Sequence, residues 1–129
     1  MNEQVLTVDL GNRSYPIVIG RGLFRDCFDL QTFLPSDNCL VVTNETVGSL
    51  YLENFRACLP SSKVRSITLA DGEKYKTLDT VRSVIDELVA CKADRQTSVI
   101  ALGGGVVGDI AGFAAACYMR GVPFVQIPT

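Results

Sequence analysis

Short apolar runs along the chain alternate with longer stretches in which apolar residues recur every three or four positions. The runs are typical of β-strands, and the longer stretches are typical of helices with one buried face. The predicted strands span residues 4–10, 15–20, 39–43, 64–69, 98–102 and 124–127. The predicted helices span residues 22–34, 46–59, 78–89 and 110–119. After the first two strands, helices and strands therefore alternate to the end of the chain.

The first two predicted strands are separated by turn-forming residues, Gly11 to Ser14, which indicates a β-hairpin. The runs at 39–43 and 98–102 are typical of strands buried on both faces of a sheet. Strands that alternate with helices of this length predict right-handed crossovers and a mostly parallel sheet. We therefore expect one α/β domain over residues 1–129, with a Rossmann-like sheet, helices on both of its faces and an N-terminal hairpin.

Two helices have apolar stripes that predict which side chains they bury. The stripe of the 46–59 helix comprises Val47, Leu50, Tyr51, Phe55, Cys58 and Leu59, and Pro60 ends the pattern. The stripe of the 78–89 helix comprises Leu78, Val81, Ile85, Leu88 and Val89, with Thr77 as its predicted N-cap.

Three loops follow predicted strands at the carboxyl edge of the sheet, where ligands bind in folds of this kind. They span residues 43–46, 71–76 and 103–109. In the third, Gly103, Gly105 and Gly108 fit the spacing G-x-G-x-x-G between a strand and a helix. Glycines there let backbone amides approach a pyrophosphate at a helix N-terminus. The alternative is a turn whose glycines only allow the helix to pack closely on the sheet.

Each candidate polar residue also has a purely structural interpretation. Asp109 fits a helix dipole partner, since we expect it in the first turn of its helix, and Asn44 fits an N-cap. The two acids and two lysines of loop 71–76 fit a solvated loop that neutralises itself, or a clamp on a ribose and an adenine. Arg120, which precedes Gly121, fits either a helix stop or a phosphate contact.

Composition narrows the possible chemistry. The chain has 129 residues and a formal net charge of −2, so it has no basic footprint for nucleic acid. It has no histidine, which excludes within this chain a histidine base, a histidine-activated nucleophile or a histidine-ligated metal. Its five cysteines form no C-x-x-C pair, which argues against a zinc knuckle. No basic segment precedes an apolar one at the N-terminus, so the sequence shows no signal peptide. No apolar run approaches the roughly 20 residues that a membrane-spanning helix needs. We therefore expect a cytoplasmic chain without nucleic-acid or membrane partners. The predicted last strand also reaches almost to Thr129, and on that basis we expect an N-terminal piece of a longer protein.

Three segments together resemble the 3-dehydroquinate synthase family of sugar-phosphate cyclases. They are Asp-Gly-Glu-Lys-Tyr-Lys-Thr-Leu at 71–78, Ala-Leu-Gly-Gly-Gly-Val-Val-Gly-Asp-Ile-Ala-Gly-Phe-Ala-Ala-Ala at 101–116, and Tyr-Met-Arg-Gly-Val-Pro-Phe-Val-Gln-Ile-Pro-Thr at 118–129. The resemblance covers the whole chain and corresponds to the N-terminal NAD-binding domain of that family, without its C-terminal metal and substrate domain. It implies conversion of 3-deoxy-D-arabino-heptulosonate 7-phosphate to 3-dehydroquinate and phosphate, in the shikimate pathway of aromatic amino acid biosynthesis. Bound NAD would take up and return a hydride.

The resemblance also implies a set of site residues. The residues that would bind NAD are Asn44, Asp71, Gly72, Glu73, Lys74, Tyr75, Lys76, Gly104, Gly105, Val106, Val107, Gly108, Asp109 and Thr129. Arg120 would reach the substrate phosphate of a neighbouring subunit, which implies a homodimer of the full-length protein. The zinc or cobalt ion of the family would be held by one Glu and two His of the C-terminal domain, so this chain would contain neither a metal ligand nor a catalytic residue. Other sugar-phosphate cyclases, a glycerol-dehydrogenase-like enzyme, or a non-catalytic nucleotide-binding module remain as alternatives.

Overall fold

The computed structural model describes residues 3–23, 29–59 and 63–129. Two strands, β1 (Gln4–Val8) and β2 (Tyr15–Ile19), form an antiparallel hairpin. The other four strands form one parallel sheet in the order β4-β3-β5-β6. Their bounds are Cys39–Asn44 for β3, Val64–Leu69 for β4, Ser98–Gly103 for β5 and Phe124–Pro128 for β6. The predicted α/β fold, with its hairpin and mostly parallel sheet, is therefore confirmed.

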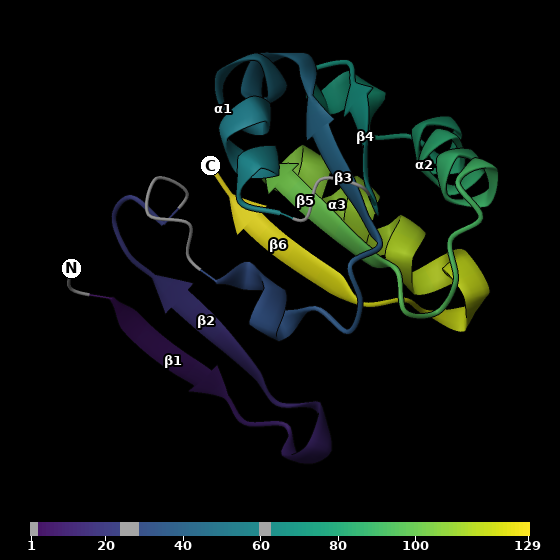
Figure 1. Ribbon diagram of the computed structural model, residues 1–129. Helices are drawn as coiled ribbons and strands as arrows, with labels where there is room; N and C mark the ends of the chain where they lie inside the picture. Colours follow the sequence, from purple (N-terminus) through teal and green to yellow (C-terminus); the bar gives the residue numbers. More distant parts are fainter. Residues whose placement is uncertain (1–2, 24–28, 60–62) are drawn as a thin grey trace.

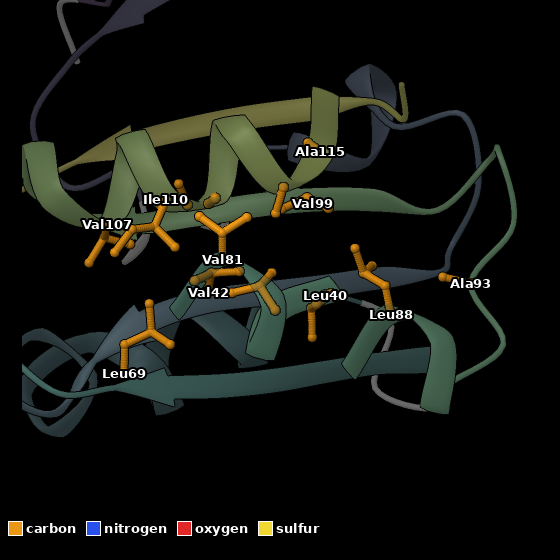
Figure 2. Close-up of a cluster of buried hydrophobic side chains, with 14 residues drawn as sticks. Leu40, Val42, Leu69, Val81, Leu88, Ala93, Val99, Val107, Ile110 and Ala115 are labelled. Carbon is orange, nitrogen blue, oxygen red and sulfur yellow. The ribbon is translucent and has the colours of Figure 1, made fainter. Parts of the chain in front are cut away.

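Helices cover both faces of this sheet, as predicted (Figure 1). Helix α1 (Glu45–Ala57) packs on one face, and α2 (Leu78–Ala90) and α3 (Gly105–Cys117) pack on the other. Successive residues of β3 show why its sequence is a continuous apolar run: Leu40 points into the cluster under α2 and α3, while Val41 points into the cluster under α1. Figure 2 shows the first of these clusters, with side chains from both helices meeting those of the strands.

The buried stripe of α1 differs from the predicted one. Phe55 and Leu59 are buried and Leu52 packs against their cluster, but Leu50 and Tyr51 are exposed. The helix turns toward the sheet along a line that includes Gly48, where an added Cβ would lie 3.1 Å from the side chain of Thr43. The predicted stripe is therefore right at Val47, Phe55 and Leu59, which lie in or against this cluster, and wrong at Leu50 and Tyr51.

The stripe of α2 is also corrected. Val81, Val84 and Leu88 are buried, whereas Leu78 and Val89 are exposed at the two ends of the helix. Val89 directly follows the fully buried Leu88, so it is exposed because it lies on another face of the helix. The predicted N-cap is confirmed, because Thr77 Oγ1 accepts a hydrogen bond from the amide of Thr80.

Two other predicted helices have different bounds. Helix α3 begins at Gly105, five residues before the predicted start, and ends at Cys117. Of the predicted 22–34 helix, residues 24–28 lie outside the described residues, and Leu30–Phe33 form a 3₁₀ turn. Pro60, the predicted stop of α1, also lies outside the described residues. Among the described residues, no helix is long and apolar enough to cross a membrane.

Candidate functional site

The strand order places the predicted loops together. From β3, the chain crosses to β4 on one side, and it then returns past β3 to β5 on the other side. The crevice between the carboxyl ends of β3 and β5 is therefore the point at which the sheet changes direction, where ligands bind in open parallel sheets. Asn44 ends β3 on one side of this point and Gly103 ends β5 on the other.

Asn44 is both a helix cap and a connection between loops. Its Oδ1 accepts a hydrogen bond from the amide of Val47 at 2.8 Å, so the predicted N-cap of α1 is confirmed. Its Nδ2 donates to Asp71 Oδ1 at 3.3 Å, in the loop that follows β4. The side chain is buried, and both of its polar groups have partners. Asn44 thus lies at the site, in a structural role.

The start of α3 presents unblocked backbone. An added Cβ at Gly104 or Gly105 would have no neighbour within 4 Å, so these two residues border open space. Gly104 is the N-cap of α3, and no side chain in the described part of the chain caps this helix. The first amides of a helix have no partner within the helix, and together with the helix dipole they favour an anion. This end of α3 therefore fits one phosphate or pyrophosphate group.

The remaining glycines of the loop serve packing. An added Cβ at Gly103 would lie 2.9 Å from Val107, and one at Gly108 would collide with the side chain of Gln126 on β6. The packing interpretation of the glycine pattern is confirmed for these two residues, whereas the phosphate interpretation stays a prediction for Gly104 and Gly105. The side chain of Val107 is buried in the cluster under the helix, and Gly108 is buried as well. Either residue can therefore offer a ligand only its backbone.

Asp109 is not in the first turn of α3, which contradicts the predicted dipole partner. The helix begins at Gly105, so Asp109 lies one turn later, where its side chain points to solvent and to Lys76. Asp109 Oδ2 lies 2.8 Å from Lys76 Nζ, and Glu73 Oε1 lies 3.3 Å from the same nitrogen. Lys76 thus connects the loop after β4 with α3. All three side chains are more than a third exposed, so these ion pairs add little to stability and mainly fix the geometry of the loop.

The hydrogen bond to Asp109 raises the pKa of Lys76 above its ordinary value, and the bond to Glu73 adds to this. The charged amine is the stabilised form, so the ion pair is complete below the ordinary lysine pKa and is lost as the pH rises through the raised value. We expect the pKa of Lys76 to fall toward its ordinary value in the Asp109→Asn variant. Titration of the Lys76 ¹³Cε resonance by NMR measures this, and equal pKa values in both proteins would contradict the ion pair.

The other predicted residues are spread around the same edge. Lys74 lies over the ring of Tyr75, with Nζ 5.1 Å from the ring centroid. The amide of Thr129 donates to the carbonyl of Gly103 at 3.3 Å, which places this residue beside the glycines. Val106 packs partly against the core. The structure therefore brings together the predicted residues of all three loops.

Arg120 is the exception. It follows α3, whose 13 residues extend for about 20 Å, and so it lies at the opposite edge of the sheet. Met119 and Arg120 both have positive φ, 47° and 63°, and Gly121 follows with 115°. Helix α3 itself ends at Cys117 with an extended C-cap at Tyr118, and the left-handed backbone follows in the 3₁₀ segment Tyr118–Arg120, so Arg120 lies just beyond the helix end. Arg120 lines a shallow depression together with Arg95, Met119 and Gly121.

Thr46, which matches the family's strand-end contact only loosely by sequence, is joined to the site by a contact that the sequence did not predict. Its Oγ1 donates a hydrogen bond of 2.8 Å to Asp71 Oδ2. The only signal in the sequence was its place in the loop after β3, in the first turn of a helix, and such threonines are common without this role.

Known proteins resemble this chain in sequence and in structure. Residues 66–129 match the model of the family described as 3-dehydroquinate synthase N-terminal. The 3-dehydroquinate synthase of Methylococcus capsulatus is 52% identical over 126 residues, which cover 98% of this chain and 35% of that protein. The chain thus spans about a third of the length of the curated relatives that it matches.

Two solved structures share the fold. A 2-epi-5-epi-valiolone synthase from Streptomyces hygroscopicus subsp. jinggangensis, solved with NAD⁺ and Zn²⁺ bound, is 35% identical with a TM-score of 0.77, over 94% of this chain and 34% of that chain. A 2-deoxy-scyllo-inosose synthase, solved with carbaglucose-6-phosphate, NAD⁺ and Co²⁺, is 25% identical with a TM-score of 0.79, over 98% of this chain and 35% of that chain. Sequence and structure agree with the resemblance of the three motifs. The chain belongs to the 3-dehydroquinate synthase family, and it corresponds to the N-terminal part of that family's members.

Proposed function

We propose that residues 1–129 are the NAD-binding domain of an enzyme that converts 3-deoxy-D-arabino-heptulosonate 7-phosphate to 3-dehydroquinate and phosphate. The observation that carries this proposal is the uncapped, open N-terminus of α3 at the switch point of the sheet. It occurs in a chain that is 52% identical to a 3-dehydroquinate synthase and that shares its fold with two cyclases solved with NAD⁺ bound. The enzyme would act in the cytoplasm.

The geometry supports a specific division of work among the residues. The amides of Gly104, Gly105 and Val106 would bind the pyrophosphate, because they are accessible and lie at the positive end of a helix dipole. Glu73, which is exposed, would accept hydrogen bonds from ribose hydroxyls, and Lys76 would donate to the nucleotide from its position between Glu73 and Asp109. Lys74, Tyr75 and Thr129 would border the same ligand.

NAD, when bound, would supply the acceptor and donor of a hydride. The residues of this chain would bind and orient the nucleotide, and none of them would be catalytic. The described residues contain no group of three or more His, Cys, Asp or Glu side chains that could hold a metal ion. On the family resemblance, we assign zinc or cobalt, and the contacts to the reacting carbons of the sugar phosphate, to a C-terminal domain of the full-length enzyme.

Arg120 supports the proposal that the full-length enzyme is a homodimer. Its distance from the candidate site, along the whole of α3, is too great for it to contact the same bound nucleotide and substrate. An arginine at that edge, beside Arg95, suits a phosphate group that a second subunit presents. We propose that Arg120 serves the neighbouring subunit's substrate in this way.

Calorimetric titration of this chain with NAD⁺ tests the nucleotide site. We expect weak, saturable binding with one site per chain, because the residues that would surround the nicotinamide lie partly outside residues 1–129. We also expect no phosphate release from the heptulosonate phosphate by this chain alone. The absence of any NAD⁺ binding would contradict the proposed site, and turnover would contradict the assignment of the catalytic groups to another domain.

Another sugar-phosphate cyclase is the second candidate, because the two solved structures described above are cyclases with different products. The higher identity to 3-dehydroquinate synthases, 52% over nearly the whole chain, favours the first. Product analysis of the full-length enzyme with the heptulosonate phosphate distinguishes the two, because only the first candidate would form 3-dehydroquinate from it.

A further inference from the structure

Asp71 has a different environment from the rest of its loop. Both oxygens of its carboxylate accept hydrogen bonds from the start of α1: Oδ1 from Asn44 Nδ2 at 3.3 Å and Oδ2 from Thr46 Oγ1 at 2.8 Å. Its backbone amide donates to Glu45 Oε1 at 3.4 Å. A carboxylate beside the N-terminus of a helix is favoured by the helix dipole. Asp71 therefore attaches the end of β4 to the end of β3.

The chain changes direction immediately after this attachment. Gly72 has φ 132° and ψ 150°, a combination that is almost confined to glycine. The turn leads into the 3₁₀ segment Glu73–Tyr75, in which the amides of Tyr75 and Lys76 donate to the carbonyls of Gly72 and Glu73. A side chain larger than hydrogen at position 72 could not make this turn without strain.

The loop is held at its other end by Lys76, which pairs with Asp109 on α3. Loop 71–76 thus spans the crevice from α1 to α3, attached by Asp71 on one side and by Lys76 on the other. The two attachments differ in kind. Asp71 bonds to the end of β3 and the start of α1, through a partly buried bond from Asn44 and an exposed bond from Thr46, whereas Lys76 pairs with two exposed carboxylates.

We infer that Asp71 is a positioning residue, which sets the conformation of loop 71–76 and acts on the nucleotide only through Glu73 and Lys76. This inference rests on the proposed function, and it separates Asp71 from the residues that we expect to touch the nucleotide. Each carboxylate oxygen keeps a further lone pair, so a direct contact to a ribose is the rival that an experiment must separate.

Thr46 makes the test possible, because it bonds Asp71 and is itself outside the predicted NAD-binding set. In Thr46→Val the shape is kept and the donor to Asp71 is lost. We expect the dissociation constant for NAD⁺, measured by calorimetry, to rise about tenfold, because a loop that adopts its binding conformation about a tenth of the time binds about tenfold more weakly. Asp71→Ala should weaken binding at least as much, and adding Thr46→Val to it should cause little further loss.

The matched control is Ser49→Ala, on the same helix. The Ser49 hydroxyl that it removes donates to the carbonyl of Thr46 and does not contact Asp71. We expect this variant to bind NAD⁺ as the parent chain does. Full affinity in Thr46→Val would overturn the inference, and so would fully additive losses in the double variant, because Thr46 would then act on the nucleotide independently of Asp71.

A second measurement needs no nucleotide. Hydrogen exchange of the Tyr75 and Lys76 amides reports whether the loop keeps its conformation, and we expect faster exchange in both Thr46→Val and Asp71→Ala. Unchanged exchange in both variants would overturn the positioning role. If the parent chain failed to bind NAD⁺, the proposed function would fail, while the exchange result would still decide whether Asp71 holds the loop.

Discussion

Replacing Gly105 with valine is expected to abolish measurable NAD⁺ binding without lowering the melting temperature of the chain. An added Cβ at this position meets nothing within 4 Å, and the residue does not have a positive φ, so the fold accepts a larger side chain. The new methyl groups would occupy the space beside the first amides of α3, where the pyrophosphate would lie. We expect the dissociation constant to rise at least about 100-fold, which corresponds to about 2.7 kcal/mol. Calorimetry and a thermal melt measure the two effects separately.

The matched control is Ala116→Val, which adds the same kind of side chain to an exposed position near the far end of the same helix. This variant should bind NAD⁺ like the parent chain. If Gly105→Val and Ala116→Val bound the nucleotide equally well, the N-terminus of α3 would not be the pyrophosphate site.

Replacing Leu88 with alanine is expected to destabilise the fold more than a change at the surface of the same helix. Leu88 is fully buried in the cluster under α2 and α3 and is labelled in Figure 2. Removing a buried leucine loses apolar contacts and leaves a cavity, so we expect the free energy of unfolding to fall by about 2–5 kcal/mol. Urea denaturation followed by circular dichroism measures this change.

Leu78→Ala provides the comparison, because it makes the same chemical change on α2 at a residue that is 75% exposed. Its effect on the free energy of unfolding should stay within about 0.5 kcal/mol. The hydrophobic pattern alone assigned both leucines to the same buried stripe. Equal falls in the free energy of unfolding in the two variants would therefore support that stripe and contradict the observed burial.

Strands were predictable because their signal is local. A strand that is covered on both faces is mostly apolar along its length, and the runs at 39–43 and 98–102 show this without reference to the rest of the chain. Helix faces were less predictable. Helix α1 approaches β3 closely at Gly48, and a hydrophobic pattern does not mark a glycine as a position that faces the sheet.

The candidate site divides in the same way. The loops could be located from the sequence, because any residue that follows a parallel strand lies at the carboxyl edge of the sheet. Their contacts could not be predicted. The bond from Thr46 to Asp71 and the pair between Lys76 and Asp109 join residues 25 and 33 positions apart, and both depend on the placing of β3 between β4 and β5.

By itself, the sequence determined the class of fold, the positions of the loops and, through three motifs, the family to which the chain belongs. Only the tertiary structure decided which glycines face open space, that Asp109 pairs with Lys76 and does not start a helix, and that Arg120 lies at the opposite edge. The physical reason is the range of the interactions. Strand and turn preferences act between neighbours in the chain, whereas the exposure of a backbone amide or the partner of a carboxylate depends on elements that the sheet order brings together.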